Sequence, residues 1–114
     1  MPNAQAQRFT RALEIIRTRG WVQKLSRDWF GQVCAGEALS IAGTERTLDR
    51  DQYFYGMDAD CDLFVAVANE LFPISRRGGW DNVPLFNDCK RTKKEMVEQV
   101  LEKCAIRAEE MVDG

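Results

Sequence analysis

The chain contains no histidine, so it lacks the side chain that most often serves as a general base or a metal ligand. Its four cysteines, at positions 34, 61, 89 and 104, form no CxxC pair. Structural zinc sites draw on closely spaced ligand pairs, so these cysteines are expected to be free thiols. We predict no metal site and no cofactor.

Long apolar runs are also missing. No stretch approaches the roughly eighteen residues that a membrane-spanning helix needs. The N-terminal segment 1–8 lacks the apolar centre of a signal peptide, so we expect a cytoplasmic protein without membrane contact. The net charge of −2 is far from the strongly basic balance of a general nucleic-acid binder.

With 114 residues, 45% of them hydrophobic and 30% charged, the chain has the composition of one globular domain spanning residues 1–114. Apolar residues spaced three and four apart predict helices over about 4–19, 33–42, 61–72 and 92–111. Alternating apolar and polar residues predict a small β-hairpin over residues 21–33. We therefore expect a mainly helical α+β fold, with three to four helices around one core.

The last predicted helix has the clearest start signal. Thr92 and Glu95 have the spacing of a capping box, in which the hydroxyl and the carboxylate bind unpaired backbone amides. Losing this cap through Thr92→Ala is expected to cost about 1 kcal/mol. Asn87 and Asp88, just upstream, are assigned the same turn and capping role.

Three aspartates, Asp58, Asp60 and Asp62, match the first, third and fifth ligands of an EF-hand calcium loop. The sixth position is Leu63 where the loop requires glycine, and the twelfth is Asn69 where it requires glutamate. The match therefore fails. Asp58 or Asp60 is expected to cap the helix that follows.

Cys34, at the start of the second predicted helix, is the candidate nucleophile, because a helix dipole can lower the pKa of a thiol. The histidine that usually activates such a thiol is missing, and the neighbours Val33 and Ala35 are apolar. A cysteine-dependent enzyme, or a carboxylate-dependent one at the turn of Asn87 and Asp88, is thus an alternative to the leading hypothesis.

Cations crowd the start of the last predicted helix, where the helix dipole prefers anions. A phosphate, an acidic protein surface or a nucleic acid would fit there, although charge runs on helices are usually just solvated. The residues assigned to this candidate anion or partner site are Lys90, Arg91, Lys93, Lys94, Arg76 and Arg77.

Three short motifs carry a family resemblance. They are Arg19-Gly20-Trp21, the segment Cys34-Ala35-Gly36-Glu37-Ala38-Leu39, and Phe86-Asn87-Asp88 followed by Arg91-Thr92 and an amphipathic helix. In these motifs the chain resembles a family of small uncharacterised proteins encoded by actinobacteria and their bacteriophages. That family has no established activity, so the resemblance implies an origin and not a mechanism.

The leading expectation is a small non-enzymatic binding or regulatory protein, phage-encoded and acting on a host or phage macromolecule. A protein partner is favoured over a nucleic acid. Self-association into a homo-oligomer is a further option, because aromatic side chains that remain exposed can form an interface. The candidates are Trp29, Phe30, Tyr53 and Trp80.

Overall fold

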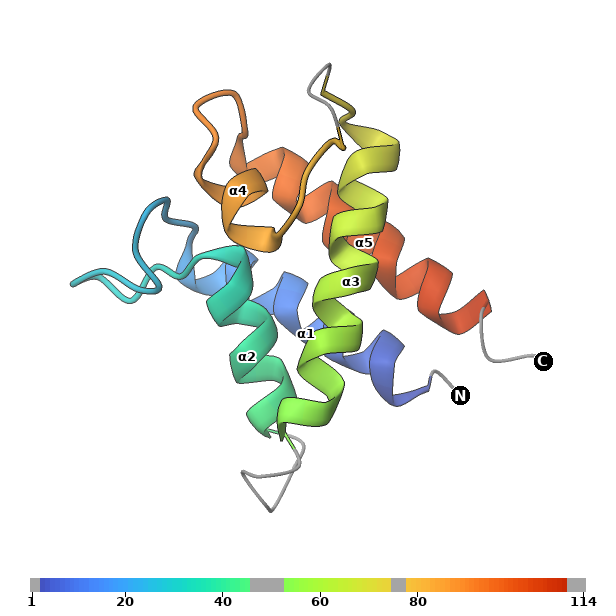
Figure 1. The fold of residues 1–114 in the computed structure, drawn as a ribbon. Coiled ribbons are helices and arrows are strands. Elements are labelled where there is room, and N and C mark those ends of the chain that lie inside the picture. The colour runs from blue at the N-terminus through green and yellow to red at the C-terminus, as the bar shows by residue number, and fades with distance from the viewer. Residues whose placement is uncertain (1–2, 46–52, 75–77, 111–114) are drawn as a thin grey trace.

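The computed structural model describes residues 3–45, 53–74 and 78–110. Its helices are α1 (Ala4–Arg19), α2 (Ala35–Glu45), α3 (Tyr53–Leu71), α4 (Val83–Asp88) and α5 (Lys94–Glu110). Figure 1 shows that α1, α2, α3 and α5 surround one core, with the short α4 lying against α2 and α3. The mainly helical architecture is as predicted from the sequence.

Helix α1 has the predicted bounds because both of its ends are set by local signals. The side chain of Asn3 accepts a hydrogen bond from the amide of Ala6 at 2.7 Å. At the other end Gly20 has a φ of 94°, a conformation that favours glycine and stops the helix. One face of α1 is buried, including Phe9 and Ile16.

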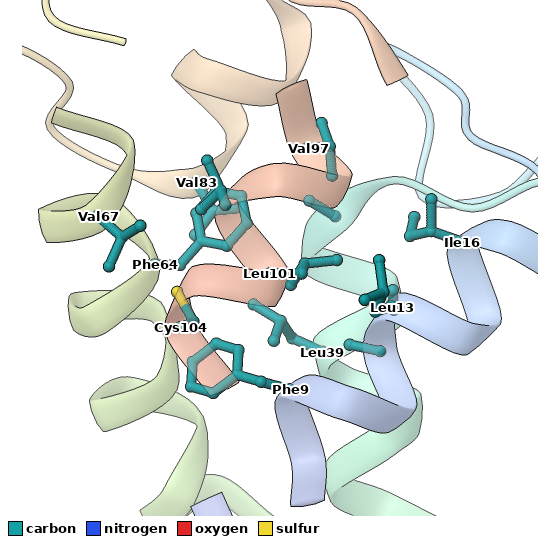
Figure 2. Packing of buried hydrophobic residues seen from close by; sticks show 14 of the residues in the cluster. Phe9, Leu13, Ile16, Leu39, Phe64, Val67, Val83, Val97, Leu101 and Cys104 are labelled. Carbon is teal, nitrogen blue, oxygen red and sulfur yellow. The ribbon is translucent and has the colours of Figure 1, made fainter. Parts of the chain in front are cut away.

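The core is built from the apolar stripes of the four long helices. Phe9 from α1, Leu39 from α2, Phe64 from α3 and Leu101 from α5 are completely buried, and Figure 2 shows them together. Helix α5, which the sequence predicts, turns one apolar face to this core. The fully buried members of this face are Val97, Val100, Leu101, Cys104 and Ala108.

The predicted β-hairpin over residues 21–33 is wrong, since no sheet forms within the described residues. Only isolated bridges occur there, from Val33 to Trp21 and to Arg27. The amide of Val33 binds the carbonyl of Gly20 at 3.0 Å, and its carbonyl accepts from Val22 at 3.1 Å. Val33 therefore pairs with the start of the segment, which leaves no residue-by-residue ladder between two strands.

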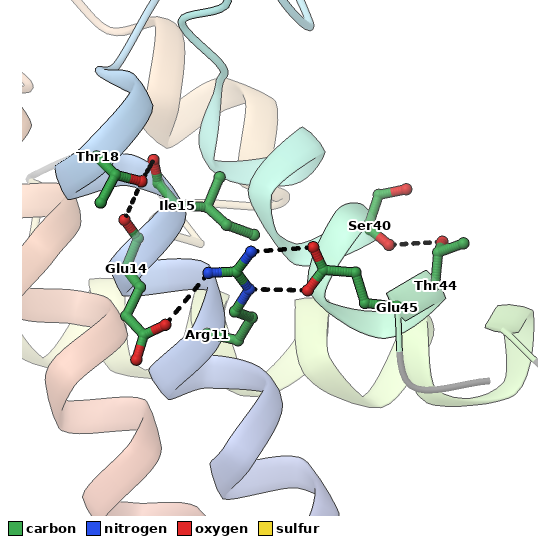
Figure 3. Close-up of polar contacts among 7 residues, drawn as sticks. All are labelled: Arg11, Glu14, Ile15, Thr18, Ser40, Thr44 and Glu45. Atoms are coloured by element: carbon green, nitrogen blue, oxygen red, sulfur yellow. Dashed lines mark hydrogen bonds and ion pairs between the residues drawn. The ribbon is translucent and has the colours of Figure 1, made fainter.

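Two predicted helix boundaries also differ. Helix α2 runs past Gly43 to Glu45, whose carboxylate binds Arg11 of α1 at 2.8 Å (Figure 3). Helix α3 begins at Tyr53, so Asp58 and Asp60 lie inside it and do not cap it. Asp60 is buried and accepts two bonds from the guanidinium of Arg8, at 2.6 and 2.9 Å. An ion pair across helices therefore explains Asp60 better than a cap does.

The connection between α3 and α5 contains α4, a helix that was not predicted from the sequence. Helix α4 is six residues long, too short for a helical repeat of apolar residues to be visible. Its N-cap is Asn82, whose side chain accepts from the amide of Leu85 at 2.9 Å. Trp80 is buried, and Phe86 packs edge-on against it with ring centres 5.2 Å apart. Aromatic packing therefore holds this connection against the core.

Candidate functional site

The segment between α1 and α2 is tied to the body by one buried side chain, Asn87 at the end of α4. Its Oδ1 accepts hydrogen bonds from the indole of Trp21 at 2.6 Å and from the amide of Ala35 at 2.8 Å. Its Nδ2 donates to the carbonyl of Val22 at 3.1 Å. Asn87 thus holds both ends of the segment at once.

Asp88 and the backbone beside it fix the segment further. The carboxylate of Asp88 accepts the amide of Lys24 at 2.7 Å, where Lys24 has a φ of 69°. The backbone of a residue other than glycine rarely adopts this left-handed conformation without a compensating contact. Gln23 adds bonds from its amide group to the carbonyls of Asn87 and Cys89, at 3.0 and 2.7 Å. The base of the segment is therefore rigidly placed.

We call residues 24–31 the aromatic loop. The carboxylate of Asp28 accepts the amides of Phe30 and Gln32 at 3.0 and 2.9 Å, and the amide of Gly31 donates to the Asp28 carbonyl at 3.2 Å. Arg19 at the end of α1 donates to the carbonyl of Gly31 at 2.9 Å. These bonds close the tip into one backbone conformation.

This ordered tip presents large apolar side chains to solvent. Trp29 is 100% exposed, Phe30 is 87% exposed and Leu25 is 55% exposed. Burying such a side chain fully stabilises a fold by roughly 1.5–3 kcal/mol. The fully exposed Trp29 contributes none of this stabilisation. Contiguous exposed apolar groups rimmed by polar residues mark interaction sites. Figure 1 shows the loop projecting from the body, on the side away from the chain termini.

Cations flank the exposed aromatic side chains. Arg27 pairs with Glu37 of α2 at 2.8 Å and stays more than half exposed. Lys24 has an exposed side chain. Beside the loop lies a depression of about 160 Å³, whose wall includes Leu25, Cys34 and Pro84. The surface is therefore apolar at its tip and polar at its edges.

Cys34 borders the depression but acts as a helix cap. Its Sγ accepts the amide of Glu37 at 3.3 Å, which is the role an N-cap side chain plays. Burial raises the pKa of the Cys34 thiol, although its bonds to the amides of Glu37 and Gly36 oppose that rise. A nucleophilic cysteine needs the opposite shift, so the arrangement does not favour catalysis.

The assigned basic cluster lies at the start of α5. Lys90, Arg91 and Lys93 are exposed and Lys94 is half-buried. Arg76 and Arg77, which were assigned to the same site, lie outside the described residues. The four described cations thus form a charged surface that follows Cys89, whose carbonyl accepts a hydrogen bond from Gln23.

The assigned caps are placed differently from the prediction. Thr92 is buried, lies two residues before α5, and its hydroxyl has no hydrogen-bond partner in the described structure, so the capping box does not form. The carbonyl of Lys93 instead receives the amides of Met96 and Val97. Glu95 lies in the first turn of α5. Asn87 does act at a helix start, but that of α2.

From the sequence, Trp29 and Phe30 were expected to lie within a hairpin and were one option for self-association. The available signal was Asp28 and Gly31 on either side of two consecutive aromatic residues, which is a typical turn composition. Trp80 is buried, and the side chain of Tyr53 lies outside the described structure. Of these four aromatic candidates, Trp29 and Phe30 are the ones found exposed.

A family model described as a family of unknown function, DUF6197, matches residues 1–107. No curated protein and no solved structure matches the chain. Within the described ranges, no helix is long and apolar enough to cross a membrane, and no cluster of three or more cysteines or acidic residues is able to hold a metal ion.

Proposed function

Because the chain belongs to DUF6197, a family of unknown function, we propose its role from its own surface. It is a small non-enzymatic binding protein whose aromatic loop docks into an apolar site on a partner protein. The observation that carries this proposal is the complete exposure of Trp29 on a loop whose backbone is fixed by hydrogen bonds.

Fixed backbone geometry favours binding because a preordered loop loses little conformational entropy when it docks. Tryptophan is also the residue type most enriched at the energetic centre of protein interfaces. Trp29 and Phe30 together supply a large apolar surface, while Lys24 and Arg27 supply polar contacts at its edge. This combination of an apolar centre and a polar rim is typical of protein interfaces.

The second candidate function is binding of an anion or a nucleic acid through the basic cluster of α5. It is supported by the exposure of Lys90, Arg91 and Lys93 at the positive end of that helix. The enzyme alternative is weaker, because Cys34 is a helix cap with a raised pKa. The carboxylate of Asp88 is likewise occupied, by the amide of Lys24.

Origin and setting are part of the same proposal. The motifs around Gly20, Cys34 and Asn87 resemble proteins encoded by actinobacteria and their bacteriophages. We therefore place this protein in the cytoplasm of such a host, where it regulates a host or phage macromolecule. An actinobacterial lysate is accordingly the source in which to seek the partner.

The test is affinity capture with three baits: the wild type, Trp29→Ser/Phe30→Ser, and Lys90→Ala/Lys93→Ala. Proteins held by the wild type are purified, and their dissociation constants are measured for all three baits. Removing an interfacial tryptophan typically costs at least about 2 kcal/mol, so we expect a loss of about 30-fold or more for the loop variant. The lysine variant serves as the surface control and should bind like the wild type.

Equal capture by the wild type and the loop variant would refute the proposal. Loss of binding in the lysine variant alone would move the function to the basic cluster. Because Trp29 and Phe30 are exposed, both baits should keep the melting temperature of the wild type, which calorimetry checks.

A further inference from the structure

A shallow apolar groove of about 290 Å³ lies between α1 and α5, on a different part of the molecule from the aromatic loop. Ala6 and Leu13 of α1 and Ala105 and Ile106 of α5 line it. The two alanines leave the hollow because their side chains are short. Ile106 is 45% exposed, so the groove has an accessible apolar wall.

Polar contacts bound the groove at both ends. The side chain of Asn3 donates to the carbonyl of Ala108 at 2.7 Å, and Arg17 donates to Glu98 at 2.9 Å. These pairs also show that α1 and α5 run antiparallel. Since the helices are held together on both sides of the hollow, the groove is a built feature of their packing.

The groove is acidic at its edge. Glu102 and Glu109 line it, and neither has a hydrogen-bond or ion-pair partner among the described residues. The nearby Arg107 is turned toward α3, where it pairs with Glu70 at 2.8 Å. The groove therefore suits an apolar side chain that carries cations beside it.

The aromatic loop has that chemistry. Trp29 and Phe30 are exposed, and the exposed cation Lys24 lies on the same short segment, whereas Arg27 already pairs with Glu37. The groove runs along the first part of α1, whereas the loop follows the far end of that helix (Figure 1). Asn87 and Asp88 hold the base of the loop, so it does not reach the groove of its own chain.

We propose that the groove between α1 and α5 receives the aromatic loop of a second copy of this chain. The inference rests on the proposed protein-binding role of the loop and names a partner for it. Two different surfaces meet in this contact, so association is head to tail and builds short open chains unless a ring closes. One loop in one groove is a small interface, so association is weak.

The test uses variants that each damage one half of the contact. Trp29→Ser/Phe30→Ser removes the aromatic side chains of the loop and leaves the groove intact. Glu102→Lys/Glu109→Lys reverses the charge at the edge of the groove and leaves the loop intact. Sedimentation equilibrium at up to about 1 mM protein should show growing oligomers for the wild type and monomers for each variant alone. An equimolar mixture of the two variants should form dimers, because one loop and one groove remain intact.

Glu95→Lys/Glu110→Lys is the matched control, since it changes the net charge equally at exposed sites of α5 outside the groove. It should associate like the wild type, and added salt should weaken both. A monomeric wild type, a monomeric mixture of the two variants, or equal disruption by the control would each overturn the inference.

The failure of this inference is distinguishable from that of the proposed function. If the wild type is monomeric but captures a foreign protein that the loop variant does not, the loop binds that protein and the second copy is excluded. If the wild type and the Trp29→Ser/Phe30→Ser variant self-associate equally well, the loop is not what the second copy binds and the inference fails, while the affinity capture still decides the proposed function.

Discussion

The side-chain oxygen of Asn87 lies 2.8 Å from the backbone nitrogen of Ala35, the first residue of α2. A residue at the end of α4 therefore accepts a hydrogen bond from the first backbone amide of a helix 52 positions earlier in the chain. The same oxygen accepts the indole of Trp21. Through Asn87 the fold couples the core to the base of the aromatic loop.

Replacing Asn87 should destabilise the protein strongly. Asn87→Ala leaves the buried amide of Ala35 and the indole of Trp21 without their acceptor. Because each orphaned group costs about 1–3 kcal/mol, we expect the free energy of unfolding to fall by about 3 kcal/mol or more. Urea denaturation measures it. The control is Asn82→Ala, which removes an exposed cap and should cost about 1 kcal/mol; equal losses would contradict the coupling.

Thr92→Val should stabilise the protein. The hydroxyl of Thr92 is buried without a partner, and valine has nearly the same shape without the polar group. Removing an unsatisfied buried group should raise the free energy of unfolding by about 1 kcal/mol. Thr92→Ser, which keeps the hydroxyl and deletes a buried methyl, should lower it by a similar amount. A destabilised valine variant would mean that the hydroxyl has a partner in solution.

Cys34 can be tested as a helix cap. Serine is a better N-cap than most residues, so Cys34→Ser should keep or raise the melting temperature. Cys34→Val has no acceptor for the amide of Glu37 and should lose about 1 kcal/mol. Thermal unfolding of the two variants separates these outcomes. If serine proved as damaging as valine, packing of the sulfur and not capping would be its role.

The ion pair of Glu70 and Arg107 predicts that the stability of the protein depends on pH. The hydrogen bond from Arg107 holds the pKa of Glu70 below its ordinary value. A lowered folded pKa means that the contribution to stability is present above the unfolded pKa of about 4.3 and disappears as the pH falls through the folded pKa. The stability gap between the wild type and Glu70→Gln should therefore be constant from about pH 6 to 8 and close in acid.

Urea denaturation of both proteins at several pH values measures that gap. Glu95→Gln is the control, because Glu95 is exposed in the first turn of α5 and no ion pair of the described structure includes it. A gap for Glu70→Gln that persists unchanged in acid would show that packing, and not charge, produces the effect.

Local signals determined the bounds of α1 and the buried face of α5, but not the start of α3 at Tyr53. Asn3 and Gly20 bound α1 because capping and left-handed backbone depend on one or two residues. The apolar stripe of α5 was legible because burial of one face imposes a helical repeat over 17 residues. Helix α4 offered no such repeat. The alternation that predicted a hairpin was equally local, but Val33 found its partners at Gly20 and Val22.

In the candidate site, too, some features follow from nearby residues and others depend on distant parts of the chain. Trp29 and Trp80 are the same residue type beside turn-forming residues, yet one is fully exposed and the other is buried against Phe86. Nothing local separates them, because burial depends on which distant surface the chain meets. Asn87 likewise stood out from the sequence as a cap, but its target lies on a helix remote in the chain.

By itself, the sequence determined a mainly helical domain, the bounds of α1, the buried face of α5 and the lack of a histidine for catalysis. Each of these depends on residue identity or on contacts within a few positions. Only the tertiary structure decided that Asn87 caps α2, that Thr92 is left without a partner and that Trp29 projects from an ordered loop. Those outcomes depend on how helices pack, and packing brings together residues whose separation along the chain carries no signal.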